Sequence, residues 1–257
     1  MNTFAAVHLI VARLMPVALG WMPVAIISVA TAADSLYFPN DDRSWESIDP
    51  AAAGWNKAKL ESALGLAGHR NSSGVLILHK GRILAEKYWK HPNPPLIHKA
   101  MVRGTDDDGH PIEDVASVQK GVTAVMIGIA QEKKLLSIDD SVTKYLGTEW
   151  SNTTEQQESA ITIRHLLTMT SGLATDLSFE ANAGTKWRYN TRVYHLLVPI
   201  IEKAANQDRH ELTERWITGP LGMTNSRWVG RRGGKNAAYG FATTARDLSR
   251  FGLMVQA

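Results

Sequence analysis

Ser117 and Lys120, three positions apart, give the strongest chemical signal in this chain of 257 residues. Lys120 is the only charged residue between Val115 and Gln131, and the apolar residues around it predict a buried helix. A lysine on such a helix is costly, because burial disfavours its charged form. The two side chains share one helix face, so Lys120 is placed to accept the proton of the Ser117 hydroxyl.

The position of Ser117 at the start of a helix also favours attack of its hydroxyl on a carbonyl group. Negative charge developing near Ser117 is stabilised by the positive end of the helix dipole. The backbone N–H of Ser117 can serve as one donor to an acyl oxyanion. The alternative is structural: Lys120 reaches the surface and Ser117 caps the helix.

The rest of the composition excludes several other classes of site. The chain has no cysteine, which excludes disulfides, thiolate metal ligands and a cysteine nucleophile. The histidines do not have metal-ligand spacing and no glycine-rich phosphate loop is present, so neither a metal nor a cofactor is expected. The net charge of +3 comes without any run of basic residues, so no nucleic-acid partner is expected.

Longer segments of the sequence, in addition to Ser117 and Lys120, indicate a known family. They are Ala116–Lys120, Ile129–Gln131, Leu135–Asp140, Ile161–Leu173, Pro220–Met223 and Ala245–Leu253. In sequence and in order they resemble the serine β-lactamase-related family. That family includes class C β-lactamases, D-alanyl-D-alanine carboxypeptidases, family VIII esterases and nylon-oligomer hydrolases. The resemblance runs from Trp55 to the end of the chain.

The resemblance implies a reaction and further site residues. Tyr189 matches the tyrosine of the family's Tyr-x-Asn element, which shares acid–base work with the lysine. Thr191 stands where the family has asparagine and Asn190 fills the middle position, so the substrate-binding role falls to either of them. The implied reaction is hydrolysis of an ester, amide or β-lactam bond of a small molecule through an acyl-enzyme on Ser117. The residues alone leave Tyr189 open as an ordinary aromatic beside a helix cap.

Local patterns predict the elements that position these residues. A helix is predicted near Trp55–Ala67, a hairpin from Gly74–His79 and Arg82–Trp89, and a loop over His91–Gly109. After Val115 only helices and loops are predicted. The helices lie near Ser117–Lys134, Ser141–Leu146, Thr162–Thr168, Thr191–Ala205 (kinked by Pro199), Arg209–Trp216 and Ala245–Val255.

One hairpin is too little sheet to be stable in water, so further strands and covering helices are needed. The expected fold is α+β of the β-lactamase/transpeptidase type, with an antiparallel sheet flanked by helices and a mainly helical lobe that carries Tyr189. Closing strands and the family's Lys/His-Thr/Ser-Gly segment are not found before Ala257, so we expect the chain to be incomplete at its C-terminus. The alternative function is a truncated, catalytically weak or inactive homologue that binds a ligand such as penicillin. The sequence does not indicate an oligomeric state.

The N-terminal segment predicts export. Leu14–Ala33 carries no charge, follows Arg13 and ends in small residues typical of a signal-peptidase site. We therefore expect residues 1–33 to be a signal peptide, and residues 34–257 to be a hydrolase domain in the periplasm or outside the cell. The alternative is a retained N-terminal anchor with the domain facing out, because about 20 apolar residues can span a bilayer. Only the anchor would bring the chain to a membrane.

Overall fold

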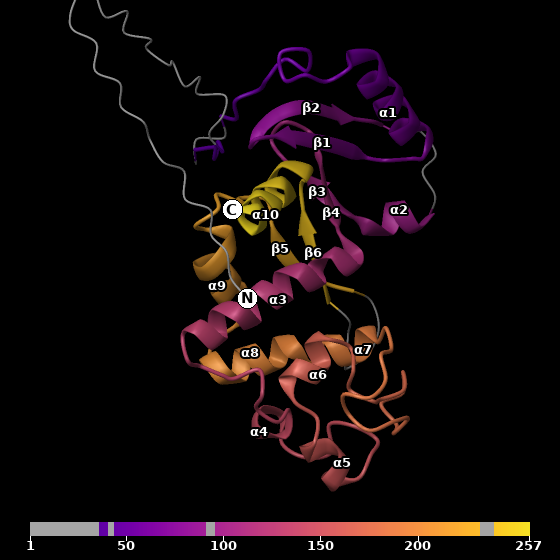
Figure 1. Ribbon diagram of the computed structural model, residues 1–257, viewed down its shortest axis with the longest axis vertical. Helices are drawn as coiled ribbons and strands as arrows, with labels where there is room; N and C mark the ends of the chain where they lie inside the picture. The colour runs from indigo at the N-terminus through magenta and orange to yellow at the C-terminus, as the bar shows by residue number, and fades with distance from the viewer. Residues whose placement is uncertain (1–35, 41–43, 91–95, 232–238) are drawn as a thin grey trace, which may run out of the picture. The chain divides into compact units, whose positions relative to one another are not determined.

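Two separate antiparallel sheets form within the residues described by the computed structural model, which are 36–40, 44–90, 96–231 and 239–257 (Figure 1). These ranges belong to one unit, Leu36–Ala257. The expected signal segment, residues 1–33, lies outside them. In the described ranges, the helices are all too short or too polar to cross a membrane.

The first sheet is the predicted hairpin. Strands β1 (Gly74–His79) and β2 (Arg82–Tyr88) pair antiparallel around Lys80 and Gly81, both of which have positive φ angles, of 49° and 83°. Two such residues in a row are typical of the tight turn that matches strand twist. Helix α1 (Lys57–His69) begins at an Asn56 cap and packs Leu60 and Leu64 on the hairpin. The predicted hairpin and first helix are therefore confirmed.

The second sheet has four strands in the order β3-β4-β6-β5. The strands are β3 (Val102–Thr105), β4 (Pro111–Asp114), β5 (Arg227–Gly230) and β6 (Tyr239–Thr243). The loop predicted over His91–Gly109 is thus wrong in part, since α2 (Leu96–Met101) and β3 lie there. The expectation of no strand after Val115 is also wrong. These strands are four or five residues long and contain glycine or charge, which is too little for a period of two to be visible.

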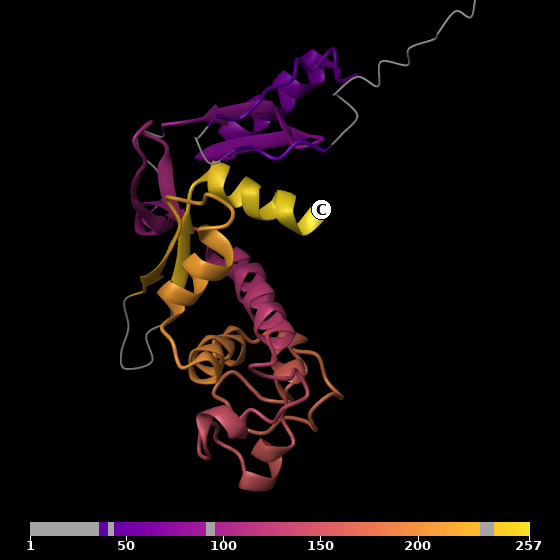
Figure 2. The same ribbon diagram turned by 90° about the vertical axis from the view of Figure 1, so that its left-hand side faces the viewer.

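Helix α3 (Gln119–Glu132) lies between the four-stranded sheet and helices α4 to α8 (Figures 1 and 2), and further elements precede or follow it in the chain. They are η2 (Ala116–Val118), α4 (Thr143–Leu146), α5 (Glu155–Ser159), α6 (Ile163–Leu167), α7 (Thr191–Tyr194), α8 (Leu197–Ala205), α9 (Arg209–Thr213), η3 (Glu214–Thr218) and α10 (Ala245–Gln256). The main core fills the space around α3 and α8, where Val122, Met126, Ile200 and Ile201 are fully buried. A rigid core of this kind holds the start of α3 in place.

The predicted helix over Thr191–Ala205 is in fact two helices, α7 and α8, separated by a turn. Pro199 therefore does not kink a helix. It lies in the first turn of α8, where a backbone N–H has no partner within the helix, so its missing donor costs nothing. Asn206 ends α8 in the left-handed conformation, as the sequence predicted.

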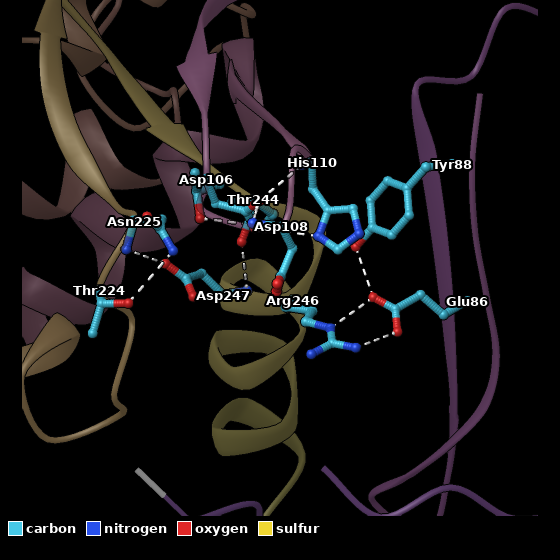
Figure 3. A network of polar contacts seen from close by, with 11 residues as sticks. Glu86, Tyr88, Asp106, Asp108, His110, Thr224, Asn225, Thr244, Arg246 and Asp247 are labelled. Carbon is cyan, nitrogen blue, oxygen red and sulfur yellow. Dashed lines mark hydrogen bonds and ion pairs between the residues drawn. The ribbon is translucent and has the colours of Figure 1, made fainter. Parts of the chain in front are cut away.

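Helix α10 packs against β1 of the hairpin sheet (Figure 2). Arg246 on α10 donates two hydrogen bonds to Glu86 on β2, of 2.7 and 2.8 Å (Figure 3). Glu86 also accepts the hydroxyl of Tyr88, whose ring stacks on His110. This network joins the hairpin to α10 and to the turn between β3 and β4.

Candidate active site

Ser117 lies in η2, a single turn that runs directly into α3. Lys120 is in the first turn of α3, and its Nζ donates a hydrogen bond of 3.2 Å to Ser117 Oγ. Lys120 is only 9% exposed, as expected from the apolar sequence around it. The serine and the buried lysine are thus in direct contact along one helix face.

Tyr189 comes from a distant loop and completes the arrangement. Its hydroxyl donates to Ser117 Oγ at 2.7 Å, and Lys120 Nζ lies 5.1 Å from the centre of its ring. Hydrogen bonds with Ser117 and with Lys120 hold the pKa of Tyr189 below its ordinary value. A lowered pKa makes the deprotonated form of Tyr189, which can accept a proton, easier to reach than in an ordinary tyrosine. The three residues predicted as catalytic therefore meet at one oxygen atom.

Charged side chains fix the loop that carries Tyr189. Glu180 accepts hydrogen bonds from Arg188 Nε at 2.5 Å and from Lys186 at 2.7 Å. These bonds, that from Arg188 first, lower the pKa of Glu180 to about 2. The N–H of Arg188 also donates to the carbonyl of Met169 at 2.9 Å. The residue before Tyr189 is thus held through both its side chain and its backbone.

The two residues after Tyr189 differ in how they are placed. Asn190 is 3% exposed, and its Oδ1 caps α7 by accepting the N–H of Val193 at 3.2 Å. Its Nδ2 donates to the carbonyls of Leu173 and Ala174 at 3.1 and 3.0 Å. Thr191 is half-buried and lines an open hollow of about 1120 Å³. The structure therefore turns the amide of Asn190 inward and leaves Thr191 facing a cavity.

Comparison with known proteins places the chain in a family. A sequence profile of the family described as Beta-lactamase matches residues 57–257. The chain belongs to the β-lactamase family. The predicted resemblance is confirmed, and so is the expected α+β fold class of the β-lactamase/transpeptidase type.

Two curated relatives share part of this β-lactamase-family sequence. An uncharacterized protein of Alkalihalophilus pseudofirmus is 30% identical over 163 residues, covering 62% of this chain and 45% of that protein. Penicillin-binding protein 4* of Bacillus subtilis is 30% identical over 149 residues, covering 46% of this chain and 31% of that protein. The chain spans less than half the length of these relatives.

Solved structures of the family share the fold. The octameric penicillin-binding protein homologue from Pyrococcus abyssi has a TM-score of 0.59 and 21% identity, over 78% of this chain and 56% of that one. A class C β-lactamase has a TM-score of 0.57 and 20% identity, over 79% of this chain and 64% of that one. At this level of identity the likeness concerns the arrangement of helices and strands.

A second group of polar contacts next to Lys120 was not expected from the sequence. Gln119 Nε2 lies 3.0 Å from His195 Nε2, and Gln119 Oε1 accepts the hydroxyl of Thr123 at 3.1 Å. Tyr194 donates its hydroxyl to the carbonyl of Lys120 at 3.1 Å. A buried glutamine next to Lys120 on an apolar helix was a visible signal. His195 and Tyr194 come from a distant segment, and nothing local in the sequence linked them to Lys120.

Asp106, Asp108 and His110 offer ligand atoms within 4.8 Å of one another in the turn between β3 and β4 (Figure 3). Asp106 Oδ1 accepts the backbone N–H groups of Asp108 and His110 at 3.1 and 2.8 Å. Its other oxygen lies 3.2 Å from the His110 ring. These contacts are typical of an aspartate that closes a turn. They account for the closeness of Asp106 and His110.

Proposed function

We propose that this chain is a serine hydrolase that forms an acyl-enzyme on Ser117 and hydrolyses an ester, amide or β-lactam bond. The observation that carries the proposal is the contact of two groups with Ser117 Oγ, Lys120 Nζ at 3.2 Å and the Tyr189 hydroxyl at 2.7 Å. A hydroxyl held between a buried amine and a phenol of lowered pKa is arranged as an activated nucleophile.

The proton of Ser117 moves first. The Lys120–Tyr189 pair accepts it as Oγ attacks the substrate carbonyl, and returns it to the leaving group when the carbonyl re-forms. The bond from the carbonyl carbon to the leaving oxygen or nitrogen breaks, and the acyl group remains bonded to Ser117 Oγ as an ester, which is the acyl-enzyme. Water then attacks this carbonyl and gives a proton to the same pair. The pair passes that proton to Ser117 Oγ as the ester bond breaks, which releases the acid and restores the Ser117 hydroxyl.

The backbone before α3 supports stabilisation of the oxyanion. The N–H of Ala116 donates to Asp114 Oδ1 and that of Val118 to the carbonyl of Val115, both at 3.0 Å. Ser117 lies between them at the start of η2, where backbone N–H groups have no helical acceptor. We propose the N–H of Ser117 as one donor to the oxyanion.

The substrate class and compartment are part of the proposal. Thr191 lines the hollow of about 1120 Å³, which is also lined by Trp150, Trp228 and Tyr239. Aromatic walls of this kind suit the apolar part of a small acyl compound. We propose Thr191, rather than Asn190, as the substrate contact. We also propose that residues 1–33 direct export, so that hydrolysis takes place outside the cytoplasm.

A covalent probe tests the nucleophile. The protein is treated separately with a fluorophosphonate and with penicillin, and the adduct is located by mass spectrometry of peptides. We expect the adduct on Ser117 and none in Ser117→Ala. Ser62→Ala, which changes a helix α1 serine whose hydroxyl donates to the carbonyl of Ala58, is the matched control and should label like the parent. Labelling of another serine, or equal labelling of folded Ser117→Ala, overturns the proposal.

A further inference from the structure

The backbone is strained directly before Ser117. Ala116 has a φ angle of 48°, in the left-handed region that residues with a side chain rarely adopt. Alanine has no polar group to stabilise this conformation locally. Such a residue stays there only where the surrounding structure holds it, and such strain is concentrated at functional sites. The conformation of Ala116 sets the path of the backbone into Ser117, the next residue.

Asp114 is the side chain that holds this turn. Its Oδ1 accepts the N–H of Ala116 at 3.0 Å. The residue is 4% exposed and ends β4, where it pairs with Ala242 of β6. The N–H of Val115 donates to the carbonyl of Phe241 on the same strand at 2.9 Å. The turn into η2 is thus tied to the sheet on one side and to a buried carboxylate on the other.

Arg231 holds Asp114 in turn. Its Nε donates to Oδ2 at 2.7 Å and its terminal nitrogen donates to Oδ1 at 2.6 Å. Arg103 on β3 lies 3.7 Å from the same carboxylate. Burial of Asp114 acts to raise its pKa, but the hydrogen bonds from Arg231 and Ala116 outweigh it and the pKa is lowered. A two-pronged bond of this kind fixes the plane of the carboxylate as well as its charge.

Gly240 leaves the space in which Asp114 lies. A Cβ at this position in β6 would lie 2.2 Å from Asp114 Oδ2, which is too close for any real contact. Gly240 pairs with Val229 of β5, so it lies in the strand between Asp114 and the strand that leads to Arg231. The glycine is therefore required for space. It gives an independent way to displace the carboxylate without changing either charged residue.

We propose that Asp114 and Arg231 form a clamp that positions the Ser117 nucleophile, by holding Ala116 in its left-handed conformation. The inference rests on the proposed function of Ser117. Both are positioning residues, because among the described contacts neither side chain touches Ser117 Oγ. Loss of the clamp lets Ala116 relax to an ordinary backbone angle and moves Oγ away from Lys120 and Tyr189.

Arg231→Ala tests the clamp through the rate constant of Ser117 acylation by the fluorophosphonate, measured per folded molecule. We expect it to fall about 100-fold, the effect of misplacing a reacting group by about 1 Å. Added methylguanidinium should raise the acylation rate of Arg231→Ala at least about tenfold, because it can occupy the space of the missing Arg231 guanidinium and bond to Asp114 in its place. Arg246→Ala removes the equally two-pronged Arg246–Glu86 bond and is the matched control (Figure 3). It should lower the melting temperature and leave the acylation rate unchanged.

Gly240→Ala tests the same clamp from the other side. The added methyl group displaces the Asp114 carboxylate, so acylation should slow by a factor similar to that in Arg231→Ala. In Asp114→Ala the clash is absent, and adding Gly240→Ala should cause no further slowing. Where Arg231→Ala does not fold, Arg231→Lys replaces it. Lysine keeps the positive charge but cannot make the two-pronged bond, so we expect acylation to slow by about tenfold.

The outcomes separate this inference from the proposed function. A parent protein without an adduct on Ser117 overturns both. A parent that labels at Ser117, with Arg231→Ala or Arg231→Lys acylating at the parent rate, overturns the clamp alone. So does a slowing in Arg231→Ala that methylguanidinium does not relieve, or one that Arg246→Ala reproduces. Independent, additive effects of Asp114→Ala and Gly240→Ala also contradict it.

Discussion

The hydroxyl of Tyr189 lies 2.7 Å from Ser117 Oγ, although 72 residues separate the two in sequence. Ser117 is fixed by the start of α3, and Tyr189 by the loop that Glu180 holds. Lys120 contacts the same Oγ from the next turn of the helix and lies 5.1 Å from the Tyr189 ring centre. One oxygen atom therefore has a phenol and an amine as neighbours, and each can be removed separately.

Replacement of Lys120 by alanine should slow acylation of Ser117 by about 100-fold or more, the usual cost of removing a positioned acid–base group. The variant should fold, because alanine is readily buried. The measurement is the rate of fluorophosphonate or ester acylation, with circular dichroism as the check on folding. Lys133→Ala, at the other end of the same helix, should acylate like the parent. A Lys120→Ala protein that acylates at the parent rate shows that the lysine is structural.

Replacement of Tyr189 by phenylalanine should slow acylation to a similar extent and change its pH dependence. Hydrogen bonds with Ser117 and Lys120 lower the pKa of Tyr189, so its base form accumulates at a lower pH than that of an ordinary tyrosine. The parent rate should therefore rise with pH and level off below the ordinary tyrosine pKa of 10. This rise should be absent in Tyr189→Phe. Tyr145→Phe, which removes a hydroxyl bonded to Asp140, is the control and should keep the rise.

The sequence was most informative where one helix carried the whole signal. The burial of Lys120 and its contact with Ser117 follow from a helical period and an uncharged segment, both of which are local. The four-stranded sheet was not predictable in this way. Strands β5 and β6 are short, β6 pairs with β4 across more than a hundred residues of sequence, and β5 joins the sheet by pairing with β6. The residue pattern within one strand does not predict pairing with a strand so distant in sequence. Asp114 was not predicted as a site residue for the same reason, because the proposed role depends on its hydrogen bonds with Arg231, which is distant in sequence.

The roles of Asn190 and Thr191 can be separated by alanine substitution. Asn190→Ala removes a helix cap and two hydrogen bonds to carbonyls of a buried loop, so it should cost about 1–3 kcal/mol of unfolding free energy. Thr191→Ala should leave stability nearly unchanged and weaken substrate binding, seen as a raised KM for a chromogenic ester. Denaturant unfolding and steady-state kinetics of both variants give the answer. A stable Asn190→Ala with a raised KM would assign the substrate contact to Asn190.

Stability should fall as the pH is lowered towards 4, and His195 should account for part of this fall. Burial, and then the charges of Lys120, Arg231 and Arg209, lower the pKa of His195 from 6.5 to about 4. Between these two values the unfolded chain binds a proton that the folded chain does not, so stability decreases as pH falls through this window. The loss should be complete below about pH 4, where both states are protonated. His195→Gln keeps a hydrogen-bonding partner for Gln119 and does not titrate, so its melting temperature should fall less steeply between pH 6.5 and pH 4. Thermal melts of parent and variant across this range, normalised to pH 8, make the comparison, and parallel curves would show that His195 does not contribute.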